Sequence, residues 1–215
     1  MPTIHHKQLD KIKRLYYKDG FSMQKIADHL SVNLNSVIYF MRKHDVKRRN
    51  LLEANRIVFE KRPLSFSIPK LLNKNQRDLK TIGVMLYWSE GAKLGHTVDF
   101  SNSDVEMIKL FLLFLRNVCG VDESRLRGYI YCHKNQNSKS LIRFWSGVTK
   151  IPKSQFTKPY VREDVTAGKK HPQRMPYGLV HVRYNDLKLL RQIKEWIEET
   201  KQTWVGSEAV KRTTL

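Results

Sequence analysis

Acidic residues and cysteines are scarce in this chain of 215 residues. Only 20 Asp and Glu stand against 40 Lys and Arg, so the formal charge is +20. Cys119 and Cys132 are the two cysteines, and no CxxC or HxxxH spacing joins them to His133 or His171. This usage argues against a disulfide framework and against a zinc site. The charge favours a polyanionic partner, and nucleic acid is the commonest one.

Long apolar runs are also missing, so the sequence predicts neither a membrane span nor a membrane partner. The first residues lack the apolar stretch of a signal peptide. We therefore expect a cytoplasmic protein associated with the nucleoid. The chain contains no internal repeat, and proline and serine gather between Pro63 and Pro69, where they predict a linker.

The N-terminal part of the chain predicts three short helices. Apolar residues recur at helical spacing over residues 7–18, 23–30 and 34–44. Asn33 is a good N-cap for the third helix, after a tight turn. Ala27 is small at the position where the second and third helices must cross closely. The pattern predicts a helix-turn-helix unit.

This spacing resembles the helix-turn-helix domains of resolvases, transposases and many repressors, whose third helix enters the major groove of DNA. The side chains expected on that groove-facing side are Asn33, Asn35, Ser36, Tyr39, Arg42 and Lys43. Asn pairs with adenine edges, and Arg and Lys pair with guanine or phosphate. The alternative is a small helical bundle with a polar face.

The rest of the chain mixes helices with short strands, which predicts an α+β fold class overall. We expect a helix-turn-helix domain over 1–62, a linker over 63–76, a second domain of mixed α/β structure over 77–200 and a tail over 201–215. The expected elements of the second domain are helix 77–90, strand 97–100, helix 104–118 after an N-cap at Ser103, strand 126–133, helix 138–148, strands 156–161 and 179–184, and helix 187–200 capped by Asn185.

Residues 82–91, Ile-Gly-Val-Met-Leu-Tyr-Trp-Ser-Glu-Gly, form the most informative segment. The run is apolar on all sides, which predicts a helix buried on all sides. Glu90 falls in the last turn, where the helix dipole disfavours an anion, and Gly91 is expected to end the helix in the left-handed conformation. A carboxylate in this place needs a cation, and a divalent metal at a phosphate is a natural candidate. The alternative is a helix end that happens to carry an acid.

The same decamer is similar to the LAGLIDADG motif of homing endonucleases. Aligning Gly91 with the last glycine of the motif places Glu90 on its metal-binding acid, Ser89 on its alanine and Met85 on its first glycine. The resemblance covers residues 77–200, and only the decamer is specific. Met85 is large where the family has glycine, and Trp88 stands where an aspartate is common.

The resemblance implies a fold and an activity. In the family, two motif helices pack together at a dyad, sheets grip the DNA major groove, and the acid holds Mg²⁺ or another divalent cation at the scissile phosphate. With one motif per chain, we expect a homodimer through the 79–91 helix that binds double-stranded DNA sequence-specifically and hydrolyses phosphodiester bonds. Similar domains joined to helix-turn-helix domains occur in sporulation-type transcription regulators that have lost cleavage. A non-catalytic DNA-binding transcription regulator is therefore the alternative, and a recombination accessory protein of a mobile element is a third.

The resemblance also implies a basic catalytic residue near the cleaved phosphate. Lys158 and Arg183 are candidates on expected strands; each has the alternative of a plain phosphate contact or a salt bridge. His96 follows the motif and is interpreted as a surface histidine rather than a group that orients water. Asn102 is interpreted as a helix cap rather than a DNA contact.

A polar, basic segment over 164–176 completes the set of candidates. Lys169, Lys170 and Arg174 lie in it, and nine basic but only two acidic residues occur from 139 to 175. Such a loop tracks a DNA backbone; the alternative is an ordinary solvated loop.

Overall fold

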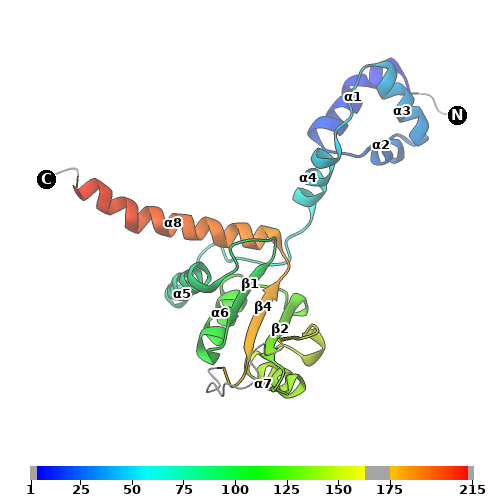
Figure 1. Cartoon of the computed structure of the whole chain (residues 1–215). Coiled ribbons are helices and arrows are strands. Elements are labelled where there is room, and N and C mark those ends of the chain that lie inside the picture. The colour runs from blue at the N-terminus through cyan, green and yellow to red at the C-terminus, as the bar shows by residue number, and fades with distance from the viewer. Residues whose placement is uncertain (1–3, 163–174, 213–215) are drawn as a thin grey trace. The chain divides into compact units, whose positions relative to one another are not determined.

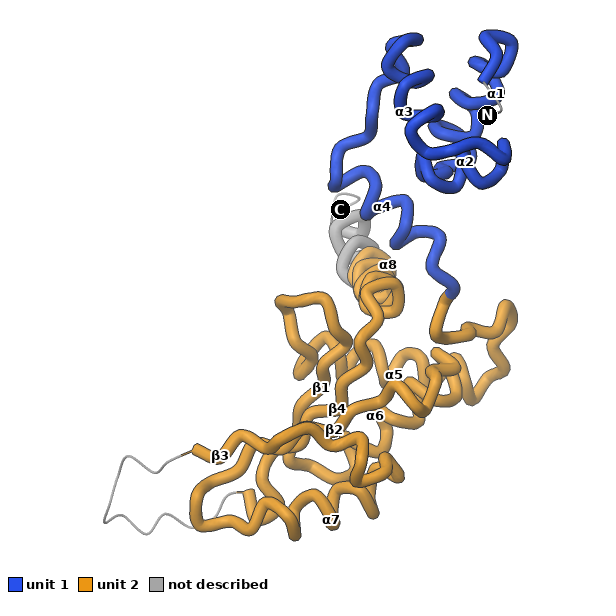
Figure 2. Tube along the Cα trace, turned by 90° about the vertical axis from the view of Figure 1, so that its right-hand side faces the viewer, with its two compact units in different colours: residues 1–63 blue, residues 64–215 orange. Residues whose placement is uncertain are grey.

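The computed structural model describes residues 4–162 and 175–212, with side chains up to residue 203. The chain divides into two compact units, residues 1–63 and residues 64–215 (Figure 2). About 57 % of the protein is helical and 14 % is strand, which confirms the predicted α+β class. Each unit has its own cluster of buried apolar residues.

The first unit is helical. Its elements are η1 (His6–Gln8), α1 (Leu9–Lys13), the π-helical turn η2 (Arg14–Lys18), α2 (Met23–Leu30), α3 (Leu34–Lys43) and α4 (Leu51–Lys61) (Figure 1). The predicted N-cap of α3 is confirmed, because the Asn33 side chain accepts a hydrogen bond from the Asn35 amide at 2.7 Å. Ser31 turns the chain between α2 and α3 with a left-handed φ of 54°. Ala27 is fully buried together with Val37, as the close crossing of these helices requires.

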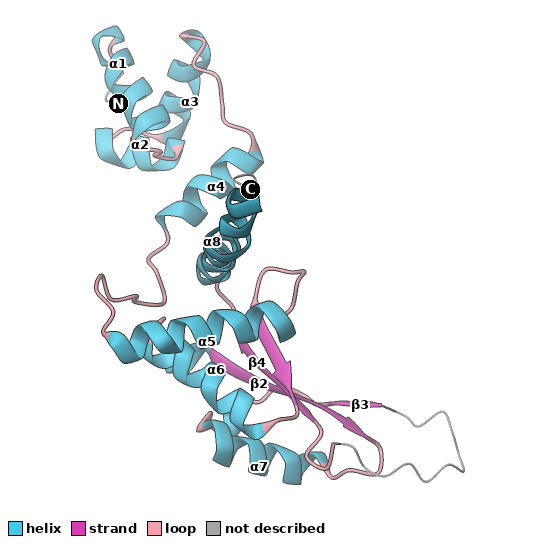
Figure 3. Ribbon diagram, turned by 90° about the vertical axis from the view of Figure 1, so that its left-hand side faces the viewer, coloured by secondary structure: helices cyan, strands magenta, loops and turns pink. Residues whose placement is uncertain are grey.

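The second unit combines four helices with a sheet. Its elements are α5 (Lys74–Glu90), β1 (Val98–Asn102), α6 (Val105–Asn117), η3 (Glu123–Arg125), β2 (Leu126–His133), α7 (Ser138–Thr149), η4 (Lys153–Gln155), β3 (Tyr160–Arg162), β4 (Leu179–Tyr184) and α8 (Leu187–Arg212). The strand order is β1-β4-β2-β3; β4 is antiparallel to both of its neighbours, and β3 is parallel to β2. Helices α5, α6 and α7 lie on one side of this sheet (Figure 3).

Several element boundaries differ from those predicted. The helix expected to begin at residue 77 begins at Lys74, because Asn73 and Gln76 form a complete capping box. α6 is capped by Asp104 rather than Ser103, since the Asp104 carboxylate accepts the amides of the first turn.

The last strands and the last helix also differ. The strand expected over 156–161 is limited to β3, and Phe156 makes only an isolated bridge to β2. Asp186 accepts the first amides of α8, a role expected of Asn185. The helix continues to Arg212, through most of the segment predicted as a tail.

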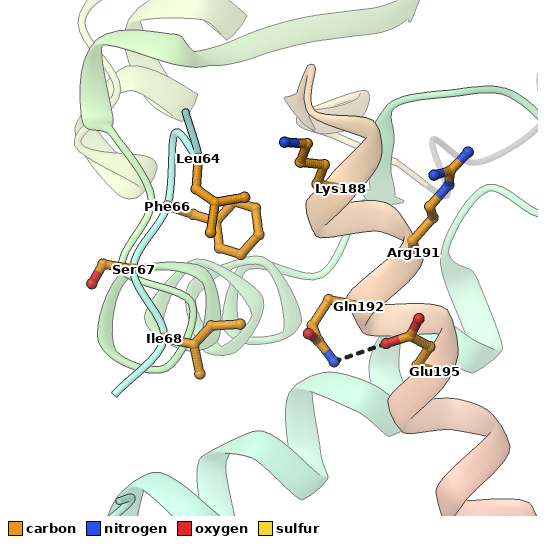
Figure 4. A pocket seen from close by; sticks show the side chains of 8 residues that line it. All are labelled: Leu64, Phe66, Ser67, Ile68, Lys188, Arg191, Gln192 and Glu195. Carbon is orange, nitrogen blue, oxygen red and sulfur yellow. Dashed lines mark hydrogen bonds between the residues drawn. The ribbon is translucent and has the colours of Figure 1, made fainter. Parts of the chain in front are cut away.

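The segment predicted as a linker over 63–76 packs onto the second unit from Ser65 onward. The Tyr184 hydroxyl donates to the Ser65 carbonyl, and the Ser65 hydroxyl donates to the Asp186 carboxylate at 2.5 Å. Phe66 bridges to Val121. These contacts leave a groove between this segment and α8, lined by Leu64, Phe66, Ser67, Ile68, Lys188, Arg191, Gln192 and Glu195 (Figure 4). Among the described helices, none has the length and apolarity to cross a membrane.

Candidate nucleic-acid interface

The sheet of the second unit has one buried face and one partly exposed face. Along β1, β2 and β4, every second side chain is buried in the core, and the side chains between them are partly exposed. The partly exposed face, hereafter the open face, carries Asp99, Ser101, Arg127, Tyr129, Tyr131, His133, Tyr160, Arg162, Leu179, His181 and Arg183. Three arginines and two histidines accompany a single acid in this set. Its charge and its aromatic residues suit a nucleic acid.

Asp99 organises the centre of the open face. Its carboxylate lies 2.8 Å from Nδ1 of His181 and accepts a hydrogen bond from Nε of Arg183 at 2.7 Å. Burial alone would raise the pKa of Asp99, but the hydrogen bonds and charges of His181 and Arg183 outweigh burial and hold this pKa below its ordinary value. Asp99 therefore fixes the orientation of two groups that can bind phosphate.

Aromatic rings extend this cluster across the sheet. The Arg183 guanidinium lies 4.3 Å from the ring centre of Tyr129, whose ring meets that of His181 edge-on at 5.2 Å. Further along, Tyr131 stacks on Tyr160 with ring centres 5.3 Å apart. The open face thus presents fixed guanidinium and aromatic groups side by side.

The two candidates for a basic catalytic residue have different surroundings. Arg183 lies on β4 at the centre of the open face. It forms a salt bridge with Asp99, which is the alternative to a catalytic role. Lys158 is exposed and precedes β3, in a segment without strand structure, so its predicted place on a strand is wrong. Thr157 holds this segment to the sheet by donating its amide to the Gly128 carbonyl at 2.9 Å.

Glu90 lies at the end of α5 and is exposed. The Lys93 ammonium donates to the Trp88 carbonyl and, at 3.4 Å, to that of Tyr87, so a cation from the chain itself neutralises the negative end of this helix. The expected left-handed conformation of Gly91 is wrong: its φ is −72° and its ψ is 150°. Glycine is required there because a Cβ would lie 2.4 Å from the Tyr87 carbonyl oxygen.

The helix before Glu90 is not buried on all sides, as its composition predicted. Gly83 faces α6, where a Cβ would lie 2.1 Å from Phe114. On the opposite side Ile82 is 42 % exposed and Met85 is 45 % exposed. The apolar run therefore divides between a core-facing side and an outward stripe of Ile82, Met85 and Ser89, which ends beside Glu90.

The candidate DNA-reading residues of α3 gather on one side of that helix. Asn35, Tyr39, Arg42 and Lys43 are exposed, and Ser36 is partly buried. The spacing of 35, 39 and 42 forms one stripe. Asn33 lies at the start of this stripe, where its side-chain oxygen is used by the cap.

The remaining candidates lie elsewhere. Lys169, Lys170 and Arg174 fall outside the described residues, as does His171. His96 is exposed in the segment between α5 and β1. Asn102 does not cap α6, as was expected of it, because Asp104 holds that position; the Asn102 side chain accepts the Asp104 amide at 2.9 Å just before the helix.

Sequence reasoning placed Arg183 on the final strand but missed its partners. Asp99 and His181 are separated by 82 residues in the chain, so no local pattern connects them. The signal available was that charged or aromatic residues occupy alternate positions of three strands, at 99, 127, 129, 181 and 183.

The described part of one chain offers few ligands for a bound metal ion. Within the described ranges, no three His, Cys, Asp or Glu side chains lie together. Glu90 offers one carboxylate, so a divalent cation would need oxygen ligands from a second copy or from phosphates. Comparisons with protein-family models, curated proteins and solved structures found no match.

Proposed function

We propose that this protein binds double-stranded DNA sequence-specifically, through α3 in the first unit and the open face of the sheet in the second. The observation that carries the proposal is the fixed cluster of Asp99, His181, Arg183 and Tyr129 on a sheet face rich in Arg and Tyr. The excess of 20 positive charges supplies the attraction to phosphates.

Base reading is assigned to α3. Its exposed stripe begins with Asn35, continues with Tyr39, which is 66 % exposed, and ends with Arg42. An amide and a guanidinium on one helical stripe match the donors and acceptors on base edges in the major groove. Asn33, in contrast, acts as the cap that orients the helix.

Two copies are proposed to associate through α5, within the predicted 79–91 helix. Supporting this, Ile82 and Met85 form an apolar stripe that the described part of the same chain leaves exposed. The position matched to the first glycine of the LAGLIDADG motif, Met85, faces outward, as a residue of a dimer contact must. A twofold dimer would bring the two Glu90 carboxylates toward one axis and favour a palindromic site.

Cleavage is the second candidate function. The exposed carboxylate of Glu90 at the end of the proposed dimer helix favours it. A divalent cation such as Mg²⁺, held by Glu90 of each copy and by DNA phosphate, would activate water and neutralise charge on phosphorus. The alternative is a non-catalytic regulator, which is supported by the internal neutralisation of the helix end by Lys93.

Binding is tested first on duplexes selected from a genomic library, by fluorescence anisotropy. Arg42→Ala should reduce the preference for a selected over a scrambled duplex by about 1–3 kcal/mol. The matched control Arg56→Ala removes the same charge from α4 and should leave the preference unchanged. Equal preference in all three proteins would refute base reading by α3.

The open face is tested by its effect on salt dependence. Arg127→Ala should weaken binding to every duplex and flatten the salt slope by about one. The control Lys109→Ala removes a positive charge from α6, on the other side of the sheet. If both variants change the slope equally, the open face is not the contact surface.

Cleavage is tested with Glu90→Gln, which keeps the size of the side chain and removes its charge. We expect wild-type protein to cut the selected duplex with magnesium, and the variant to bind this duplex without cutting it. Binding without nicking by the wild-type protein, with any divalent metal, would favour the regulator.

A further inference from the structure

Helix α4 is well formed but has no buried residue. A complete capping box starts it, because Asn50 and Glu53 each accept the other's amide. Leu51 is 76 % exposed, Leu52 is 80 % exposed and Val58 is 56 % exposed. A helix of this length is marginal without packing on one side, and these three apolar side chains lie outside the packing that α4 makes with its own unit.

The side of α4 that packs on its own unit is identified by two contacts. A Cβ on Gly20 would lie 2.9 Å from Ile57 and 3.1 Å from the Lys61 ammonium. Lys61 also donates to the Asp19 carbonyl. Ile57 and Lys61, four residues apart, thus face the unit's own body, and Leu51 and Val58 lie on an adjacent side.

The uncovered side has the spacing of a coiled-coil seam. Leu51, Asn55 and Val58 recur at intervals of four and three residues. The charged side chains of the helix interior, Glu53, Arg56 and Glu60, fall off this seam. Asn55 is the only polar residue between Leu51 and Val58 on the seam. A seam without basic residues suits an apolar protein surface rather than DNA.

We propose that α4 pairs in parallel with α4 of a second copy of this chain, with the two Asn55 side chains opposite each other. A single asparagine in an apolar seam favours two parallel strands, because the two amides satisfy each other only in that register. A twofold axis parallel to the pair makes the contact self-complementary.

This contact depends on the dimer proposed through α5. The 11 residues of α4 span only about 16 Å. Two such helices bury far less than the roughly 800 Å² per partner of a stable interface. The pair therefore forms when the copies are already held together, at the high effective concentration of a tethered contact. Its function is to fix the two first units of the dimer to each other.

Disulfide cross-linking in the full chain tests the inference. Cys119 and Cys132 are both fully buried, so Asn55→Cys would introduce the accessible thiol. Under mild oxidation we expect this variant to form a covalent dimer at least tenfold faster than Arg56→Cys. The control residue is also exposed, and it lies one position off the seam. Adding Val58→Asp to Asn55→Cys should remove the advantage, and circular dichroism checks that each variant is folded.

Sedimentation of the reduced wild-type protein separates the possible failures. A dimer whose Asn55→Cys and Arg56→Cys variants cross-link equally slowly would refute the α4 pair and leave the α5 dimer standing. A monomer at every concentration, with no cross-link, would refute both. Rapid cross-linking at position 55 alone supports the pair.

Discussion

The close crossing of α5 and α6 at Gly83 leads to a measurable prediction. A methyl group at this position would lie 2.1 Å from Cγ and 2.4 Å from Cδ2 of Phe114. Phe114 is fully buried, and its ring centre lies 5.8 Å from that of Phe111 and 6.1 Å from that of Trp196. The ring therefore has no free space to move into, and Gly83→Ala must push the two helices apart.

The expected magnitude combines two opposing effects. Replacing glycine by alanine in a helix stabilises it by up to about 1 kcal/mol. Overpacking a filled core costs about 1–3 kcal/mol, and the contact distance here places Gly83→Ala at the upper end. Gly147 in α7 is the matched control, because a Cβ there meets nothing within 4 Å. We expect the free energies of unfolding of the two variants to differ by roughly 2–3 kcal/mol, with Gly83→Ala the less stable.

Urea unfolding followed by tryptophan fluorescence measures this difference. All four tryptophans lie in residues 64–215, so the signal reports on the second unit alone. In thermal unfolding, a unit of this size should separate the two variants by about 4–12 °C. If Gly83→Ala were stabilised as much as Gly147→Ala, the close approach of α5 to α6 would be refuted.

Two further predictions concern pH. Asp99→Asn should lower the free energy of unfolding at pH 7 by about 1–3 kcal/mol, because His181 and Arg183 lose the charged carboxylate that they share and one of its two oxygens. The fold holds the pKa of Asp99 below its ordinary value. The ionised carboxylate therefore contributes fully to the free energy of unfolding at any pH above the ordinary carboxyl pKa. The difference between wild type and variant should therefore shrink as the pH falls below about 4, and a constant difference would contradict the ion pair. Burial raises the pKa of Tyr87 to about 12. The unfolded chain releases this proton near pH 10, so wild type should lose stability between pH 10 and 12 relative to Tyr87→Phe; parallel pH profiles in alkaline urea unfolding would contradict the burial of the hydroxyl.

Elements with a strong local period were predictable from the sequence. The apolar stripe of α6 and the alternation of β2 each reflect one buried side, and the structure places both within a residue of the prediction. The residue that caps a helix was harder to predict. Ser103 and Asp104 are adjacent, and the side chain of either one suits the N-cap of α6. Tertiary contacts decide between such neighbours.

The candidate site was only partly predictable. The decamer's composition indicated burial on all sides, since sequence alone does not separate a residue facing the core, such as Gly83, from one facing outward, such as Met85. The left-handed turn predicted at Gly91 was wrong, and glycine is needed there because a Cβ would clash with the nearby Tyr87 carbonyl. Contacts between Asp99 and His181 depend on how β1 and β4 pair, which no local pattern specifies.

The attachment of Ser65 to Tyr184 and Asp186 determines where the chain can be cut for study. A fragment that starts at residue 64 keeps the acceptor for the Tyr184 hydroxyl and the strand bridge of Phe66. A fragment that starts at residue 69 lacks the residues of this segment that line the groove, the last of which is Ile68. It would uncover the flank of α8 and leave the Tyr184 hydroxyl without the Ser65 carbonyl as acceptor. Loss of solubility or of DNA binding in the shorter fragment would then report a damaged fold rather than the missing first unit.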